Sequence, residues 1–488
     1  MSQEIKQLQP TAVWENFYSL TQIPRPSKHE ERITAFMKSF GESLGLETIV
    51  DEVGNVIIRK PATPGYEDRV GIVLQGHLDM VPQCNSDLNF DFLTQPINAY
   101  VDGEWVRARG TTLGADNGIG VAAAMAVLQS KTLCHGPIEA LFTIDEETGM
   151  TGAIHLSPKA LKGRILMNLD SETEGELYVG CAGGLDATIT IPYTEEPSRK
   201  EGARISIAGL KGGHSGMDII LGRGNSIKIL MRIANHLEDL DVRLVSLTGG
   251  SLRNAIPREA VATFALPDGK YAELAKRVET LAAAIRHELA LVDEGLTITC
   301  EKASPSGTML SQASHRAVVR SLLVCPNGVV RMSDAMPGLV ETSSNLASVE
   351  LGGGTVVGKC LLRSSVDSGK EALGEQICAA VALAGGRCEL TNGYPGWNPN
   401  MESSILKTMR EVYSKEYGKE PKVMAIHAGL ECGILGGSYP HMDMISFGPT
   451  IMSPHSPDER VKVDTVGKFW DYLCKVLAQA PKCTGCCK

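Results

Sequence analysis

The sequence has no apolar stretch that approaches the about 20 residues needed to cross a membrane. Its first residues are polar and lack the basic start and apolar core of a secretory signal peptide. It also has no long basic run, and its formal net charge is −10. These absences argue against a membrane or a nucleic acid as partner, and they lead us to expect a cytoplasmic protein.

The motifs of two large enzyme classes are incomplete. The glycine-rich stretches at 114–120 and 180–184 do not form the G-x-G-x-x-G pattern of dinucleotide-binding folds. Gly213, His214 and Ser215 begin like the G-x-S-x-G turn of serine hydrolases, but Met217 stands where the closing glycine is required. The sequence therefore disfavours nucleotide binding and a serine nucleophile.

The cysteines do not suggest a disulfide framework. There are 13, an odd number, and most are scattered along the chain, as expected for buried thiols in a reducing compartment. Cys483, Cys486 and Cys487 form a C-terminal cluster, but a C-x-x-C pair needs two further ligands to make a structural zinc site. We expect this end of the chain to be a disordered tail.

The composition is that of a globular protein with an ample core, since 43% of the residues are hydrophobic and 21% are charged. A length of 488 residues allows about two to four domains. Residues 70–170 alternate strand-like, loop and helix-like segments, which is typical of a doubly wound sheet. The same style returns after residue 396, so we predict an α/β catalytic domain made of residues 1–185 and 397–488.

Residues 186–396 mix strands and helices differently and are predicted to form a large inserted α+β domain. Segments 203–210 and 243–247 have strand-like patterns, whereas 225–237 and 270–291 have helix-like patterns. Two similar α+β halves would explain the size of this insert, although no clear sequence repeat is visible.

Histidine or acidic residues stand at the edge of five short apolar runs. Such runs indicate buried strands, and ligands gather at the carboxyl ends of strands in an open α/β sheet. The residues concerned are His77 and Asp79 after run 70–74, Asp116 just before the run that starts at Ile119, Asp145, Glu146 and Glu147 after 138–142, Asp170 after 165–169, and His455 after 442–447. Imidazole nitrogen and carboxylate oxygen are the donors of dinuclear zinc-type sites, so the pattern predicts a metal centre.

Simpler interpretations exist for each residue alone. A single carboxylate in a loop is more often solvated than bound to a metal, and Asp116 could be a helix N-cap. His77 could be a buried, hydrogen-bonded core histidine. The joint pattern is much less expected by chance, because four of the five stretches follow a strand-like run and Asp116 starts a helix-like one.

These residues carry a resemblance to a known family. The sequences at 77–79, 115–118, 146–149, 168–170 and 454–457 resemble the five motifs of the M20 metallopeptidases. Longer stretches at 109–116, 209–216, 252–258 and 427–433 are similar to the aminoacyl-histidine dipeptidase branch, also called Xaa-His dipeptidase or peptidase D. The resemblance runs from about residue 8 to about residue 481.

The resemblance implies a pairing of metal ligands. His77 and Asp170 would hold one ion, Glu147 and His455 the other, and Asp116 would bridge both. The implied cofactor is two Zn²⁺ per chain, with Co²⁺ or Mn²⁺ as possible substitutes. Asp79 would hydrogen-bond the second ring nitrogen of His77 and fix its tautomer.

The spacing alone does not decide which of Asp145, Glu146 and Glu147 is the general base. The family pattern of two acids followed by one residue and Gly149 assigns Glu146 as the base and Glu147 as a ligand. Glu146 would take a proton from the attacking water and pass it to the leaving amine. Asp145 would then be structural or solvated.

The inserted domain acts as a lid in the family that the chain resembles. His214 would stabilise negative charge on the substrate carbonyl, and Asn254 and Arg363 would bind the substrate carboxylate. Gly429 would let the backbone approach the ligand, whereas Arg253 and Arg258 are weaker candidates. Met217 replaces a glycine expected in this branch and leaves the shape of the turn beside His214 open.

The function implied by the resemblance is metal-dependent hydrolysis of dipeptides, preferring carnosine-like Xaa-His substrates. The partners would be a small dipeptide and a second copy of the chain, bound through the lid. An alternative within the same metal-hydrolase family is an N-acyl amino acid deacylase or a broader aminopeptidase. A non-enzymatic, metal-free binding protein is a third alternative, which the complete ligand set and Glu146 disfavour.

Overall fold

The computed structural model describes residues 3–483 of the chain, so Cys486 and Cys487 of the C-terminal cluster lie outside the described residues. The backbone N–H of Cys483 donates to the carbonyl of Asp68 (2.8 Å). The chain divides into two compact units: unit 1 comprises Met1–Gly180, Pro399–Ala425 and Leu430–Lys488, and unit 2 comprises Cys181–Asn398 and Ile426–Gly429. Nowhere in residues 3–483 is there a helix with both the length and the apolarity to span a bilayer.

Unit 1 is built around an eight-stranded mixed sheet. In spatial order its strands are β1 (Glu47–Val50), β2 (Val56–Lys60), β6 (Ile138–Thr143), β3 (Ile72–His77), β7 (Ile165–Asn168), β23 (Asp443–Ser446), β8 (Glu176–Cys181) and β22 (Lys422–Ile426). The four central strands, β6, β3, β7 and β23, run parallel. Every residue of β3, β6 and β7 is buried, as expected for parallel strands covered on both faces.

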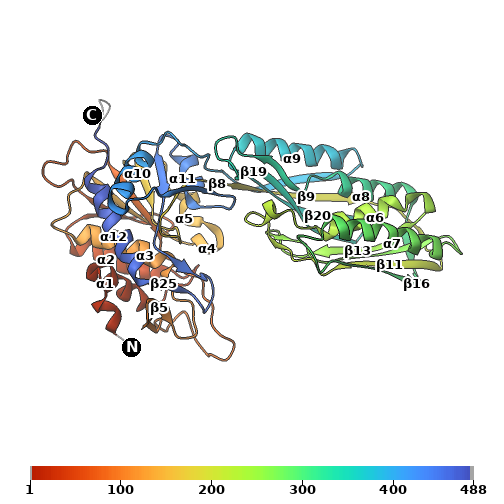
Figure 1. Ribbon diagram of the computed structural model, residues 1–488, viewed down its shortest axis with the longest axis horizontal. Coiled ribbons are helices and arrows are strands. Elements are labelled where there is room, and N and C mark those ends of the chain that lie inside the picture. Colours follow the sequence, from red (N-terminus) through yellow and green to blue (C-terminus); the bar gives the residue numbers. More distant parts are fainter. Residues whose placement is uncertain (1–2, 484–488) are drawn as a thin grey trace. The chain divides into compact units, whose positions relative to one another are not determined.

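Helices flank this sheet. They are α1 (Thr11–Thr21), α2 (Glu31–Ser43), α3 (Ala115–Gln129), α4 (Glu146–Gly149), α5 (Thr151–His155), α10 (Ser404–Tyr417), α11 (Glu431–Ser438) and α12 (Val463–Ala478), with a short 3₁₀ turn at Gln3–Gln7. Helix α1 buries Val13, Phe17 and Leu20, one face at helical spacing. Helices α1 and α3 pack together beside α12, which comes from the far end of the chain (Figure 1).

A small four-stranded sheet joins distant parts of unit 1. Its order is β24 (Ile451–Met452), β25 (Arg460–Lys462), β5 (Trp105–Ala108) and β4 (Ala99–Asp102). The pairing of β25 with β5 fixes Val461 opposite Val106. The loop between β24 and β25 contains His455, so this sheet carries the C-terminal histidine to the segment that precedes Asp116.

Unit 2 is a nine-stranded antiparallel sheet with helices on one face (Figure 1). Its main strands, in spatial order, are β16 (Thr297–Ala303), β11 (Glu201–Ala208), β15 (Ala260–Leu266), β13 (Arg243–Gly250), β19 (Val340–Gly352), β20 (Thr355–Ser364), β9 (Gly183–Pro192) and β21 (Arg387–Tyr394), and β18 (Gly328–Met332) also pairs with β19. The helices are α6 (Ser226–His236), α7 (Tyr271–Glu288), α8 (Gln312–Val324) and α9 (Asp367–Ala382). Short strands and turns complete the unit: β10 (Glu195–Pro197) with β17 (Thr308–Leu310), β12 (Gly213–His214) with β14 (Ala255–Ile256), and 3₁₀ turns at Ile219–Leu221 and Glu238–Leu240.

The sheet of unit 2 contains the same topology twice. One half runs β11-α6-β13-β15-α7-β16, and the other runs β9-α8-β19-β20-α9-β21. In both halves the fourth strand lies beside the first, followed by the third and the second, and the halves meet where β13 pairs with β19. The two α+β halves inferred from the size of the insert are therefore present, and the first half is inserted between β9 and α8 of the second.

The core of unit 2 explains why this duplication is stable. Alternate residues of β9, namely Ala187, Ile189 and Ile191, are buried, which places them on the helix-covered face. All four helices contribute to one continuous hydrophobic cluster, for example through Leu230 and Ile285. The two halves thus share one core.

Candidate active site

The carboxyl ends of the central parallel strands bring the predicted residues of unit 1 together. Strand β3 ends at His77, β7 ends two residues before Asp170, and β6 ends three residues before Glu146. Because these strands are parallel neighbours, their carboxyl ends share one edge of the sheet. The side chains that follow them therefore meet at that edge.

Asp116 lies between the two histidines. Its Oδ1 is 3.1 Å from Nε2 of His77, and its Oδ2 is 3.2 Å from Nε2 of His455. Asp116 has a non-helical conformation within the first turn of α3, two residues after Gly114, which has a left-handed backbone (φ +70°). One carboxylate thus presents an oxygen to each imidazole, as a bridging ligand would.

Two groups of potential ligands share Asp116. His77, Asp116 and Asp170 form one group, and Asp116, Glu147 and His455 form the other; within each group one donor atom per residue lies within 4.8 Å of the others. Nε2 of His77 is 3.4 Å from Oδ1 of Asp170, and Nε2 of His455 is 3.0 Å from Oε2 of Glu147. The structure therefore brings together the five residues that the sequence singles out as ligands.

The residues present fit a pair of divalent cations. Within the described part of the chain, Oε1 of Glu147 and Oδ1 of Asp170 are buried and have no hydrogen-bond partner. A buried carboxylate oxygen without a partner is costly unless a cation or donor satisfies it. The donor set of imidazole nitrogens and carboxylate oxygens is the one that zinc and similar transition metals prefer.

The cluster holds more carboxylates than imidazoles, and the pKa values of several of its members are shifted. Burial raises the pKa of Asp170 to about 8, and the nearby Asp116 adds to this. Hydrogen bonds with Asp116 and Glu147 raise the pKa of His455 to about 11. Burial alone would lower the pKa of His77, but Asp170 and the other carboxylates around it raise that pKa well above its usual range. Cations that bind such a cluster release these protons.

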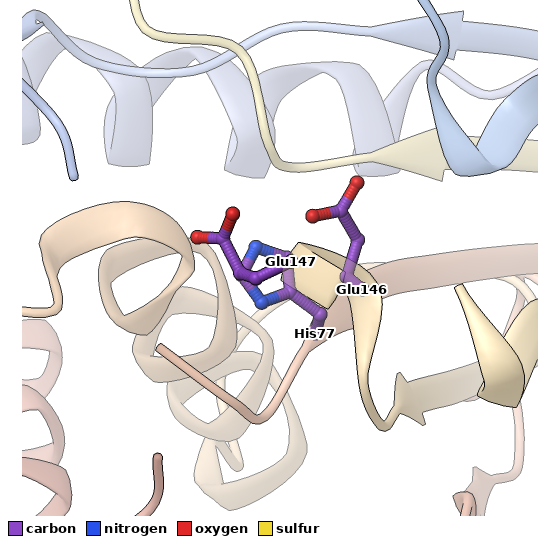
Figure 2. Close-up of side chains that lie close together, drawn as sticks. All are labelled: His77, Glu146 and Glu147. Atoms are coloured by element: carbon purple, nitrogen blue, oxygen red, sulfur yellow. The ribbon is translucent and has the colours of Figure 1, made fainter. Parts of the chain in front are cut away.

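Glu146 and Glu147 are adjacent residues of α4, and their side chains point in different directions. Figure 2 shows the carboxylate of Glu147 beside the His77 ring, whereas that of Glu146 diverges from it. One carboxylate oxygen of each still lies within 4.8 Å of a His77 ring nitrogen. Burial raises the pKa of Glu146 well above its usual range. Glu146 thus faces the ligand cluster without belonging to either group that shares Asp116.

Asp79 holds both His77 and the loop that carries the two glutamates. One carboxylate oxygen is 3.4 Å from Nδ1 of His77. The same carboxylate accepts the backbone N–H groups of Glu146 (3.0 Å) and Glu147 (3.2 Å) and the hydroxyl of Ser27 (2.8 Å). Burial opposes ionisation, but these donors and His77 lower the pKa of Asp79 to about 2.

Asp145 has a different place from its two neighbours. It is buried, has a left-handed backbone (φ +56°), and its carboxylate is bound by Lys28, Thr148 and Thr151. These contacts lock the turn that leads into α4. Of the two interpretations that the sequence leaves for Asp145, structural or solvated, the structure shows the first.

His214 in unit 2 is oriented by its own turn. Its Nδ1 accepts the backbone N–H groups of Gly216 (3.2 Å) and Met217 (3.1 Å). With Nδ1 acting as acceptor, the ring proton of the neutral imidazole resides on Nε2, which lies 3.5 Å from a guanidinium nitrogen of Arg363. Burial, followed by the charge of Arg363, lowers the pKa of His214. The imidazole is therefore a neutral donor through Nε2.

Met217 does not disturb this turn. Its side chain is exposed, its φ is not positive, and its N–H takes part in the hydrogen bonding that orients His214. A glycine is not needed there, so the departure noted in the sequence leaves the geometry of the turn intact.

Arg363 is a buried cation on β20. One guanidinium nitrogen is 3.4 Å from the hydroxyl of Tyr394, and Nε is buried without a hydrogen-bond partner among residues 3–483. Gly216 fits closely beside it, since a Cβ there would lie 3.2 Å from Nε. Arg363 and His214 are thus adjacent, with unused donors.

The other predicted substrate residues of unit 2 differ in their contacts. Asn254 is exposed, and its carbonyl accepts the N–H of Ser215 (2.8 Å). Gly429 lies two residues from His427, whose ring shares a 2.7 Å hydrogen bond with Ser343. The two weaker candidates are engaged within the protein, because Arg253 pairs with Asp186 and Arg258 donates to the carbonyl of Leu210 (3.0 Å).

Three buried residues around the candidate metal ligands have no role in the sequence prediction. Glu459 accepts backbone N–H groups next to Asp116, and Arg25 donates to the carbonyls of Leu78 and Asp79. Glu431 accepts from Gln75 (2.6 Å) and Thr143 (2.8 Å). Burial raises the pKa of both Glu459 and Glu431 to about 7. None of the three lies in a periodic pattern that would have marked it.

Comparison with known proteins agrees with this site. The chain is 45% identical over 481 residues to a cytosol non-specific dipeptidase of Escherichia coli (strain K12), covering 98% of this chain and 99% of that one. The crystal structure of aminoacylhistidine dipeptidase from Vibrio alginolyticus matches with a TM-score of 0.94 and 47% identity over 98% of this chain and 99% of that one. An aminopeptidase PepT from Bacillus cereus shares the fold, with a TM-score of 0.62, 16% identity and 97% and 99% coverage. The model of peptidase family M20/M25/M40 matches residues 73–479, and the chain belongs to this family.

Proposed function

We propose that the protein is a metal-dependent dipeptidase that prefers Xaa-His substrates such as β-alanyl-His. The observation that carries this proposal is the pair of three-residue donor groups that share Asp116. The names of the two most similar proteins reported above, a cytosol non-specific dipeptidase and an aminoacylhistidine dipeptidase, support a dipeptide as the substrate.

The cofactor of the proposed enzyme is two Zn²⁺ per chain. His77 and Asp170 would hold one ion, Glu147 and His455 the other, and Asp116 both. When bound, two such ions lower the pKa of the attacking water and polarise the scissile carbonyl. Co²⁺ or Mn²⁺ could replace zinc, because the same donors accept them.

Glu146 is the proposed general base. Its carboxylate would accept a proton from the attacking water and deliver it to the leaving amine, so one residue serves both transfers. Asp79 would act through others: it holds Nδ1 of His77 and the N–H groups of Glu146 and Glu147, which keeps ligand and base in register.

Unit 2 would act as a lid that recognises the scissile carbonyl and the free carboxylate of the dipeptide. His214 would donate from Nε2 to the carbonyl oxygen as negative charge develops there. Arg363 would bind the free carboxylate of the substrate, supported by its unpartnered Nε. Asn254 would add an amide donor, and Gly429 would let the backbone lie close to the substrate.

We also propose a cytoplasmic location, in line with the name of the Escherichia coli relative. A homodimer through unit 2 is supported by strand β18, which exposes Val329, Val330 and Met332. Exposed apolar residues on a strand favour pairing with another chain. Light scattering of the wild type and of a Val330→Lys variant would test this.

A substrate panel tests the proposed function against its alternative. The purified protein would be assayed with Xaa-His dipeptides, β-alanyl-His, other dipeptides, dipeptide amides and N-acetyl amino acids, with and without added zinc. We expect zinc-dependent cleavage of Xaa-His dipeptides and poor cleavage of the amides. Preferential cleavage of N-acetyl amino acids would instead identify a deacylase, and efficient cleavage of amides a broader aminopeptidase.

A further inference from the structure

Glu459 makes an unusual set of contacts for a carboxylate that is 2% exposed. Its Oε2 accepts the backbone N–H groups of Leu113 (2.7 Å) and Gly114 (2.9 Å). Its Oε1 accepts those of Ala115 (2.8 Å) and Asp116 (3.2 Å). Four successive peptide donors therefore converge on one side chain, and the last belongs to the residue that lies between the two histidines.

The backbone of this segment is shaped for such an anion. Successive N–H groups can point to one concave side when a left-handed residue interrupts the chain, and Gly114 supplies it with φ +70°. The segment also begins α3, whose N-terminus favours a negative charge. A Cβ at Gly114 would lie 2.6 Å from a guanidinium nitrogen of Arg25 and 2.9 Å from the Met80 sulfur, and the positive φ would strain any other residue.

Arg25 holds the same segment from its carbonyl side. It is 3% exposed and donates to the carbonyl of Gly114 (2.6 Å), whose N–H is bound by Glu459. Its other terminal nitrogen donates to the carbonyls of Leu78 (2.9 Å) and Asp79 (3.0 Å), directly after His77. Arg25 thus ties the His77 segment to the Asp116 segment.

Glu459 ties the His455 loop to these two segments, because it follows His455 by four residues in the loop between β24 and β25. We propose that Glu459 is a positioning residue for the metal centre: it fixes the backbone of residues 113–116 to the His455 loop and so aims the Asp116 carboxylate between His77 and His455. This inference rests on the proposed metal-dependent function. Glu459 touches no reacting atom and acts through Asp116.

The chain offers a matched control for this role. Glu139 is also buried (6% exposed), accepts the backbone N–H groups of Lys162 and Gly163 (2.7 Å each), and is paired with Arg59. It lies near the start of β6, whereas the ligands follow the carboxyl ends of the strands. Replacing Glu139 therefore removes the same kind of contact without touching a ligand segment.

The test is zinc titration of the metal-stripped, full-length protein against a competing chelator. Glu459→Gln keeps the size of the side chain but places an NH₂ group against two N–H donors, so two of the four hydrogen bonds are lost. We expect zinc affinity to fall about 10–100-fold, as for other groups that orient metal ligands. The kcat measured at limiting zinc should fall and recover as zinc is raised, with KM unchanged.

Glu139→Gln should lower the melting temperature but leave zinc affinity within about threefold of the wild type. A folded Glu459→Gln variant with zinc affinity also within threefold would overturn the proposal. If Glu459→Gln does not fold, Glu459→Asp, which keeps both acceptors but retracts them by one methylene, is judged by the same criterion. Asp116→Ala separates the two levels: two zinc ions retained per chain in that variant would refute the bridging role of Asp116 in the proposed metal centre, whatever Glu459→Gln does.

Discussion

The pKa values of the histidines at the two candidate clusters, one in each unit, are shifted in opposite directions. In unit 1, hydrogen bonds with Asp116 and Glu147 raise the pKa of His455 to about 11. In unit 2, burial and then the charge of Arg363 lower the pKa of His427 to about 3. The first cluster is rich in carboxylates and suits a cation, whereas the second is built around a guanidinium and suits an anion. A dipeptidase needs both kinds of cluster, one for metal ions and one for the substrate carboxylate.

The largest expected effect comes from removing the residue shared by both donor groups. Asp116→Ala should reduce bound metal to one ion or none, because one carboxylate serves both groups, and activity should fall to background. Elemental analysis of the purified variant measures this directly. Two zinc ions per chain in Asp116→Ala would show that Asp116 bridges nothing.

Glu146→Gln should keep both metals and lose most of its turnover. The amide is nearly isosteric but cannot accept the proton, and a general base typically contributes about 10²–10⁴-fold to kcat. Steady-state kinetics together with metal analysis check both statements. Asp145→Asn is the control, because Asp145 is tied to Lys28, Thr148 and Thr151 and should affect stability more than kcat. Near-normal kcat in Glu146→Gln would return Asp145 to consideration as the base.

His214→Ala tests the neutral donor of unit 2. Metal content should stay intact, and kcat should fall about 10²–10³-fold, as when one donor to a developing oxyanion is removed. KM should change less, because the contact strengthens mainly in the transition state. A variant whose KM rises while kcat is preserved would assign His214 to ground-state binding instead.

Arg363→Ala should act mostly on KM. The substrate carboxylate is charged in both ground and transition states, and a charged hydrogen bond contributes about 1.5–3 kcal/mol, so KM should rise about ten- to hundredfold. The variant should also discriminate less between free dipeptides and their amides. Arg363→Lys keeps the positive charge but cannot pair with both carboxylate oxygens as a guanidinium does. Its KM should lie between those of the wild type and Arg363→Ala. An unchanged KM in Arg363→Ala would contradict the assignment.

The prediction with the smallest effect on activity concerns the stability of unit 2 in acid. Burial, and then Arg243, lowers the pKa of His315 to about 4 from an ordinary 6.5, while its Nδ1 accepts the N–H of Leu244 (3.2 Å). Between these values the unfolded chain binds a proton that the folded chain does not, so stability falls as pH drops from 6.5 to 4 and is unaffected above 6.5. The total is about 3 kcal/mol.

His315→Asn is the variant that isolates this contribution. The amide oxygen can still accept from Leu244 but does not titrate, so melting temperatures measured between pH 4 and 7.5 should slope less than in the wild type. Equal slopes would mean that other groups cause the acid sensitivity.

Much of the candidate ligand cluster could be predicted because its residues follow buried strands. Runs 70–74, 138–142 and 165–169 predict buried strands of an open α/β sheet, and parallel strands expose their carboxyl ends at one edge. The structure places β3, β6 and β7 there, with His77, Glu147 and Asp170 close together. Local patterns were sufficient because one rule of sheet architecture connects them.

Glu459 and Arg25 could not be predicted in this way. Each lies in a loop outside any periodic pattern. Each binds backbone atoms of residues far along the chain, and a backbone contact cannot be recognised from the side chains in a sequence. Glu459 binds peptides 343–346 positions away. The small sheet of β4, β5, β24 and β25 was not predicted either, because its strands are only two to four residues long and show no clear periodic pattern.

The repeated halves of unit 2 have a consequence for how the chain folds. The first strand of the unit, β9, and the last, β21, are hydrogen-bonded neighbours, with Gly184 opposite Tyr394. Once unit 2 has folded, its two ends are side by side. The inserted segment Cys181–Asn398 then links the flanking parts of unit 1 over a short distance. The folding free energy of unit 2 then offsets the entropy cost of closing this loop, before β22 and β23 pair with their neighbouring strands. Unit 2 should therefore gain protection from hydrogen exchange earlier than the C-terminal strands of unit 1.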